Sequence, residues 1–137
     1  MTNGRFEVGL VSADRRLVDF YAQVFEREEL PAFEAATGTV HRLQFPGAVL
    51  KVMVPGVAPA PASAAEPFFA MTGLRYLTLG TYDLDGVIAR ATGTGGSVAH
   101  GPMELADGVR LVVLVDPDGN TIEVVEESDS QPASSSS

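Results

Sequence analysis

The sequence predicts an α+β fold built from two βαβββ modules. The main observation is the order of the expected elements, because a strand, a helix and three strands are followed by a linker and then by the same order again. The two halves also share a register: Gly47 precedes Lys51 by four residues, and Gly119 precedes Glu123 by four. One such module cannot bury the face of its own sheet, so we expect both to pack as a pseudo-twofold pair in a single domain, residues 1–127.

Module one spans residues 5–55. Its first strand is expected at 6–12, where Val and Leu dominate, and Asp14 can cap the helix that follows. Apolar residues then recur at helical spacing from Leu17 to Phe25. Turn signals at Thr37-Gly38 and Phe45-Pro46-Gly47 separate three further strands, which are expected at 32–37, 39–45 and 48–54.

A linker, residues 56–72, joins the modules. Most of it belongs to the stretch 55–67, which is rich in Pro, Ala and Ser and can form neither a helix nor a central strand. Module two spans residues 73–127, with Asp83 as the cap of its helix. Its strands are expected at 74–81, 97–101, 109–116 and 120–126, and its helix at 83–90.

Composition narrows the class of protein. The 137 residues include 9 basic and 18 acidic side chains, a net charge of −9, which argues against nucleic acid or an anionic membrane as a partner. The absence of cysteine excludes disulfides and thiolate metal sites. No apolar run approaches the roughly 20 residues of a membrane helix, and the start lacks a signal-peptide pattern, so we expect a cytoplasmic protein. Residues 128–137 are small and polar and are expected to form a disordered tail.

Three segments carry a resemblance to a known family: EVGLVSAD with DFY in module one, YLTLGTYDLDGVIAR at the start of module two, and DPDGNTIEVVEE at the end. The chain resembles the vicinal oxygen chelate superfamily, which contains glyoxalase I, bleomycin-resistance proteins and extradiol dioxygenases. The resemblance runs from about Phe6 to Glu127. It implies a glyoxalase-like fold, in which two βαβββ modules form a cleft of curled mixed sheets, and it implies a homodimer.

In metal-dependent members of this family, the first and last strands of each module hold a divalent metal. The resemblance places these positions at Glu7, Lys51, Tyr76 and Glu123, and only Glu123 matches the ligand usual at its position. Lys51 is a cation without a lone pair and would repel a metal. We therefore expect no cofactor and assign these four residues as catalytic, with the Lys51 charge held by Glu7 and Glu123. A divalent metal at Glu7 and Glu123 is the alternative.

Four more residues are expected to line the cleft, namely His41, Thr78, Met53 and His100. Alternation along the strand puts Met53 on the face of Lys51, and a histidine can act as acid or base near neutral pH. Simpler interpretations stay open for the main candidates. Lys51 can be an edge-strand charge, Glu7 a solvated side chain, Tyr76 a core aromatic, Glu123 a surface charge, and both histidines structural.

Three functions follow from the resemblance. The first is a metal-independent enzyme of isomerase or lyase type, in which Glu7 or Glu123 is the base and Lys51 and Tyr76 stabilise negative charge. The second is a non-catalytic protein that binds a small molecule or an antibiotic, for which an acidic surface favours a cationic ligand. The third is a metal-dependent enzyme of glyoxalase or dioxygenase type with atypical ligands.

Overall fold

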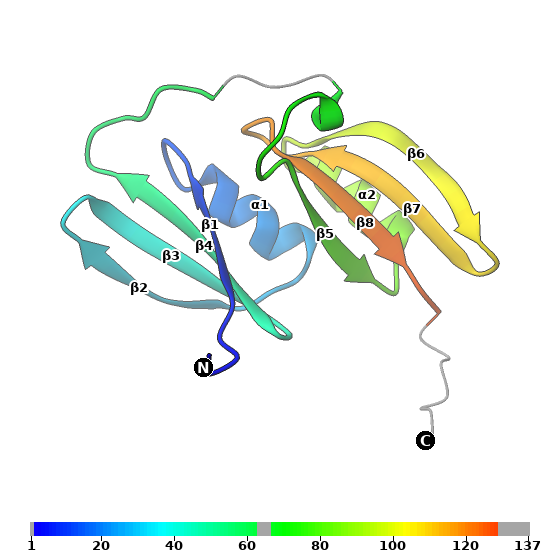
Figure 1. Cartoon of the computed structure of the whole chain (residues 1–137), viewed down its shortest axis with the longest axis horizontal. Helices are drawn as coiled ribbons and strands as arrows, with labels where there is room; N and C mark the ends of the chain where they lie inside the picture. Colours follow the sequence, from blue (N-terminus) through cyan, green and yellow to red (C-terminus); the bar gives the residue numbers. More distant parts are fainter. Residues whose placement is uncertain (1, 63–66, 129–137) are drawn as a thin grey trace. The chain divides into compact units, whose positions relative to one another are not determined.

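A computed structural model describes residues 2–62 and 67–128. They form two compact units, and the division between the units falls at residues 63 and 64, inside the predicted linker. Each unit has the order strand, helix and three strands, as predicted from the sequence (Figure 1). The architecture is an α+β fold of two four-stranded mixed sheets, each with its own helix.

The first unit contains β1 (Glu7–Val11), α1 (Arg16–Val24), β2 (Glu29–Ala35), β3 (Gly38–Phe45) and β4 (Ala48–Pro55). Its strands lie in the order β1-β4-β3-β2, and β1 runs parallel to β4 while the other neighbours are antiparallel. Two-residue turns join β2 to β3 and β3 to β4, because Ala35 pairs with Gly38 and Phe45 with Ala48. These tight turns fix which side chains share a face of the sheet.

The second unit repeats this plan. It contains the single 3₁₀ turn η1 (Phe68–Ala70), β5 (Tyr76–Thr81), α2 (Leu84–Gly93), β6 (Ser97–Ala106), β7 (Val109–Val115) and β8 (Thr121–Glu126). The strand order β5-β8-β7-β6 is that of the first unit, with β5 parallel to β8. The internal repeat seen in the sequence is therefore a repeat of topology and register.

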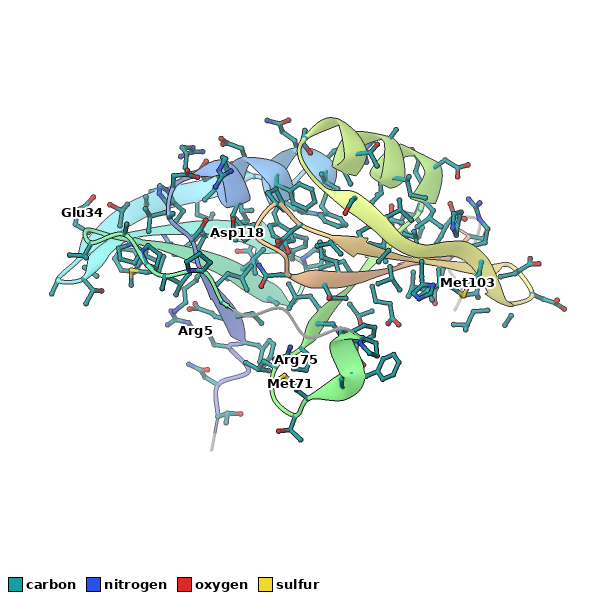
Figure 2. The ribbon with its side chains drawn as sticks, turned by 90° about the horizontal axis from the view of Figure 1, so that it is seen from above. Arg5, Glu34, Met71, Arg75, Met103 and Asp118 are labelled. Atoms are coloured by element: carbon teal, nitrogen blue, oxygen red, sulfur yellow. The ribbon has the colours of Figure 1, made fainter. Side chains whose placement is uncertain are left out.

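In each unit one face of the sheet packs against the helix and forms the core (Figure 2). Alternation along β4 sends Leu50 and Val52 to the helix side, where both are buried. Ile122 and Val124 do the same on β8. The helices contribute the buried residues Leu17, Val18, Phe20, Tyr21 and Val24 in α1 and Leu84, Val87 and Ala91 in α2.

Helix capping agrees with the sequence in α2 and differs in detail in α1. The Asp83 carboxylate accepts a 3.1 Å hydrogen bond from the Gly86 amide and caps α2 as predicted. The cap residue of α1 is Arg15, whose side chain makes no capping bond. Asp14, one residue earlier, accepts from the amide of Arg16 at 2.9 Å and so satisfies the first helical N–H.

Two strands differ from their predicted bounds. β2 begins at Glu29, three residues before its predicted start at residue 32. The Glu29 side chain is ion-paired with Arg15 at 2.7 Å, and this tertiary contact draws a charged residue into the strand. β6 continues through Gly101-Pro102, which predicted its end, because it is an edge strand with bulges that tolerate a proline.

The 3₁₀ turn η1 lies inside the predicted linker, after its Pro-rich stretch. Phe69 and Met71, which follow the Pro-rich stretch, are mainly exposed and do not enter the core. Figure 2 shows Met71 and Arg75 close together in the loop between η1 and β5. The predicted disordered tail falls, apart from Ser128, outside the described residues. None of the helices among the described residues is long and apolar enough to cross a membrane.

Candidate functional site

The helix-free face of the first sheet carries a charged cluster. The helix-free face is the side of β1, β4 and β3 that faces away from α1, and it carries Glu7, Gly9, Lys51, Met53 and Arg42. The charged cluster consists of Glu7, Lys51 and Arg42 together with Arg5. Parallel pairing aligns Glu7 with Val49 and Gly9 with Lys51, so all these side chains project to one side. The Lys51 Nζ atom lies 3.2 Å from Glu7 Oε1. The predicted contact between these two residues is therefore present.

Lys51 lies in the interior of its sheet. β4 has β1 on one side and β3 on the other, which removes the interpretation of Lys51 as an edge-strand charge. Only 15% of the Glu7 side chain is exposed, so Glu7 is not a freely solvated surface acid. A half-buried ammonium needs a paired carboxylate, and Glu7 supplies it.

Arg5 completes the cluster around Glu7. Its Nε and Nη2 atoms both lie 2.7 Å from Glu7 Oε2, a charge-assisted contact to a single oxygen. Figure 2 shows Arg5 beside β1, on the side of the sheet away from α1. The hydrogen bond from Arg5, and after it the bond from Lys51, lower the pKa of Glu7 against the opposing effect of its partial burial. Glu7 is therefore an ionised carboxylate held between two cations.

Arg42 also belongs to the cluster. Like Arg5, it was not among the site residues predicted from the sequence. It lies directly opposite Lys51 in the antiparallel pair of β3 and β4. Its guanidinium donates to the Pro31 carbonyl at 2.9 Å and sits 5.6 Å from the centre of the Phe33 ring. The sequence does contain a signal for Arg42, because the two-residue turn Pro46-Gly47 fixes the pairing of Arg42 with Lys51.

The helix-free face of the second sheet carries the other predicted residues. It is the side of β5, β8, β7 and β6 that faces away from α2. The Thr78 hydroxyl donates to Glu123 Oε1 at 3.0 Å, and the two residues are partners in the parallel pair of β5 and β8. Tyr76, two residues before Thr78, is 51% exposed and is therefore not a core aromatic. Its ring makes an edge contact with Phe68 at 5.1 Å between centroids.

The two histidines fall on different sides of their sheets. His100 pairs with Val113, which in turn pairs with Glu123, so this chain of partners places His100 on the helix-free face. His41 pairs with Val52 and therefore points to the side of α1, away from Lys51. Its Nδ1 atom lies 3.5 Å from Glu29 Oε2. The expectation that His41 lines the cleft stays a prediction, and this register puts its side chain on the face of β3 opposite to that of Arg42.

Met53 lies two residues beyond Lys51 on the same face, as predicted, and its sulfur accepts from the Thr37 hydroxyl at 3.7 Å. The predicted pairing of Lys51 with Glu123 joins residues of different units and stays a prediction. The structure thus brings together Glu7 with Lys51 in one unit, and Thr78 with Glu123 in the other.

The donor chemistry of the first cluster does not suit a divalent metal. Glu7 already accepts from Arg5 and Lys51, and an ammonium 3.2 Å from its oxygen repels a second cation. In the described part of the chain, no group of three His, Asp or Glu side chains is placed to hold a metal ion. What this cluster offers a ligand is fixed positive charge and hydrogen-bond donors.

A family model described as the Glyoxalase/Bleomycin resistance protein/Dioxygenase superfamily matches residues 10–124 of the chain. The match covers both units and includes Lys51, Tyr76, Thr78 and Glu123, whereas Glu7 lies just before it. No significant match was found among curated proteins.

Solved structures share the fold at low sequence identity. TioX from Micromonospora sp. ML1 is 23% identical, with a TM-score of 0.63 over 90% of this chain and 98% of that protein. A glyoxalase family protein from Bacillus cereus is 12% identical, with a TM-score of 0.80 over 93% of this chain and 96% of that one. A glyoxalase I mutant from Zea mays is 16% identical, with a TM-score of 0.72 over 91% of this chain and 46% of that one. At these identities the likeness concerns the fold alone.

Proposed function

Because the chain belongs to the glyoxalase/bleomycin resistance protein/dioxygenase superfamily, we propose that it binds a small organic molecule without a divalent metal. The observation that carries this proposal is the 3.2 Å contact between Lys51 Nζ and Glu7 Oε1. The ammonium occupies the second of the positions at which metal-dependent relatives have ligands, and it engages the residue at the first. A fixed ammonium can stabilise negative charge on a bound molecule, as a metal ion does in those relatives.

We propose further that the reaction is a proton transfer of isomerase or lyase type. Glu7 is a weak base, since its pKa is lowered by Arg5 and Lys51. Glu123 is the better candidate for the base, because no ion pair engages it among the described residues and the Thr78 hydroxyl orients one of its oxygens. In this proposal the exposed Tyr76 hydroxyl, on the same face of the second sheet as Glu123, stabilises the charge that develops on the substrate.

The second candidate is a non-catalytic protein that sequesters a small molecule, including an antibiotic. It is favoured by the aromatic groups at the start of the second unit, where Tyr76 and Phe68 are in edge contact and Phe69 is mainly exposed. Exposed aromatic rings suit the wall of a binding site for an organic ligand. The same fold serves both candidates, so the chemistry of the bound molecule decides between them.

Metal analysis tests the first part of the proposal. The purified protein is analysed for bound metals, and its melting temperature is compared with and without added Mn²⁺, Ni²⁺, Zn²⁺ and Mg²⁺. We expect no stoichiometric metal and no shift with any of the ions. A stoichiometric metal that is lost in Glu7→Gln would contradict the proposal.

Proton exchange separates the enzyme from the binding protein. Small organic acids and carbonyl compounds are screened for binding, and each bound compound is then incubated with the protein in D₂O. Loss of a C–H signal in the proton NMR spectrum, abolished in Glu123→Gln, supports proton transfer. Tight binding with every C–H signal retained supports sequestration.

The proposal also includes a homodimer in the cytoplasm. Sedimentation equilibrium of the purified chain tests the dimer, and a single species at the monomer mass of 14.4 kDa would refute it. Fractionation of the source cells tests the location.

A further inference from the structure

The helix-free face of the first sheet has the opposite charge to the chain as a whole. The chain carries a net charge of −9, yet this face gathers Arg5, Lys51 and Arg42 around one carboxylate, Glu7. The other acids in these strands, Glu29 and Glu34, project to the helix side, because they pair with Leu43 and Thr39. The local balance is therefore three cations against one anion.

Exposure makes this excess of positive charge accessible. The Glu7 side chain is 15% exposed, against 37% for Lys51 and 71% for Arg5. The carboxylate thus lies beneath its two partners, and a molecule that approaches the face meets an ammonium and a guanidinium first. Gly9, the partner of Lys51 on β1, has no side chain to cover the ammonium.

Arg42 adds a third charge that nothing on the face neutralises. It lies opposite Lys51 in a directly paired position, where two like charges repel and destabilise the sheet. The Pro31 carbonyl and the Phe33 ring hold its guanidinium, but neither carries a formal negative charge. Its Nε atom is buried and makes no hydrogen bond to another described residue. An arrangement that keeps two cations adjacent is explained if a bound anion lies close to them.

We propose that this face binds an anionic group of the ligand, a carboxylate or a phosphate. Lys51 and Arg5 make the direct contacts, and Arg42 strengthens the positive field from the neighbouring strand. This inference rests on the proposed binding of a small organic molecule and specifies its chemical class. It reverses the expectation from net charge, which favoured a cationic ligand, since the field at a site depends on the nearest charges.

Matched probes test the charge requirement. Benzoate and benzamide have nearly the same shape and differ in charge, and phenyl phosphate separates a phosphate from a carboxylate. Binding of each to the full chain is measured by NMR titration of backbone amides. We expect benzoate or phenyl phosphate to bind roughly tenfold or more tightly than benzamide, with the largest shifts in β1 and β4, and to weaken as salt is added.

Variants connect the binding to the cluster. Lys51→Met keeps an unbranched side chain that is one heavy atom shorter and removes its charge, and Arg42→Gln removes the neighbouring charge. Both are expected to abolish the preference for the anion. Arg16→Gln on α1 makes the same change in net charge on the other side of the sheet and is expected to leave the preference intact. Circular dichroism confirms that each variant is folded.

Three results would overturn the inference. Equal affinity for benzoate and benzamide would remove the charge requirement while leaving small-molecule binding in place. A preference for the anion that survives in Lys51→Met, or that is lost equally in Arg16→Gln, would place the binding elsewhere. Failure of both anions to shift β1 and β4 at about 50 mM would mean that no anion site exists there. None of these results bears on the metal analysis, which tests the proposed function separately.

Discussion

Gly9 gives the sharpest test of how the first sheet is arranged, because its substitution is expected to raise stability and lower binding together. Gly9 lies in the middle of β1, an edge strand, and pairs with Lys51. A Cβ atom added there would meet no other atom within 4 Å, and the backbone is not in the left-handed region that favours glycine. Nothing in the local structure of the strand therefore requires glycine.

The expected gain in the free energy of unfolding of the Gly9 variants has two contributions. Glycine in a strand costs about 0.5–1 kcal/mol relative to alanine, because the unfolded chain has more freedom to lose. In Gly9→Val a further 0.2–1 kcal/mol, approximately, comes from cross-strand contact with the Lys51 methylene groups. We expect Gly9→Ala to be about 0.5–1 kcal/mol and Gly9→Val about 0.7–2 kcal/mol more stable in urea unfolding, with the melting temperature roughly 2–4 °C higher for each kcal/mol gained.

Binding should change in the opposite direction. A side chain at residue 9 stands beside the Lys51 ammonium, so Gly9→Val and Gly9→Phe should weaken benzoate binding in order of size. Gly38→Ala is the control for stability, because its Cβ would lie 2.6 Å from the Pro55 Cα and clash with the Val54 carbonyl oxygen. It should be destabilised. If Gly9→Ala loses stability as Gly38→Ala does, the assignment of Gly9 to an uncovered face is wrong.

Three further predictions concern the second unit and the core. Glu126 accepts from the Leu84 amide at 2.8 Å and from Arg110 at 2.9 Å, and these bonds lower its pKa, so Glu126→Ala should cost about 1 kcal/mol at pH 7. A lowered folded-state pKa gives a contribution that is complete above the unfolded value of about 4.3 and is lost as the pH falls through the folded value. Urea unfolding should therefore show the difference from wild type vanishing at low pH; a constant difference would refute the role of the charge. Asp83→Ala removes the cap of α2 and should cost about 0.5–2 kcal/mol, with Asp83→Asn retaining most of the stability. Leu43→Ala empties a fully buried site and should cost about 2–5 kcal/mol in the same assay, and a cost below 1 kcal/mol would mean that the first core is loosely packed.

Local signals in the sequence were enough for the element order and for much of the register. The turns at Pro46-Gly47 and at Asp116-Pro117-Asp118-Gly119 are short and stiff, so they fix strand pairing over several residues on either side. Alternation then placed Lys51 and Met53 on one face without any tertiary information. The cap at Asp83 was equally local.

Contacts between residues distant in sequence explain where the predictions failed. Glu29 belongs to β2 because Arg15 pairs with it, and no pattern within residues 26–29 contains that partner. His41 lies on the side of α1 because it pairs with Val52, a residue eleven positions away in the sequence, and its expected place in the cleft stays a prediction. β6 continues through a proline because it lies at the edge of its sheet, which is a property of strand order.

The sequence by itself determined the two-module fold, the family, and the coincidence of Lys51 with a position where relatives hold a metal ligand. These follow from periodicity, turn residues and short motifs, all of which act over a few neighbouring residues. Only the tertiary structure decided that Lys51 lies in a central strand and that the Glu7 carboxylate is held by both Arg5 and Lys51. The reason is that electrostatic fields depend on distance in space, and strand pairing brings together charges that the chain keeps up to 44 residues apart.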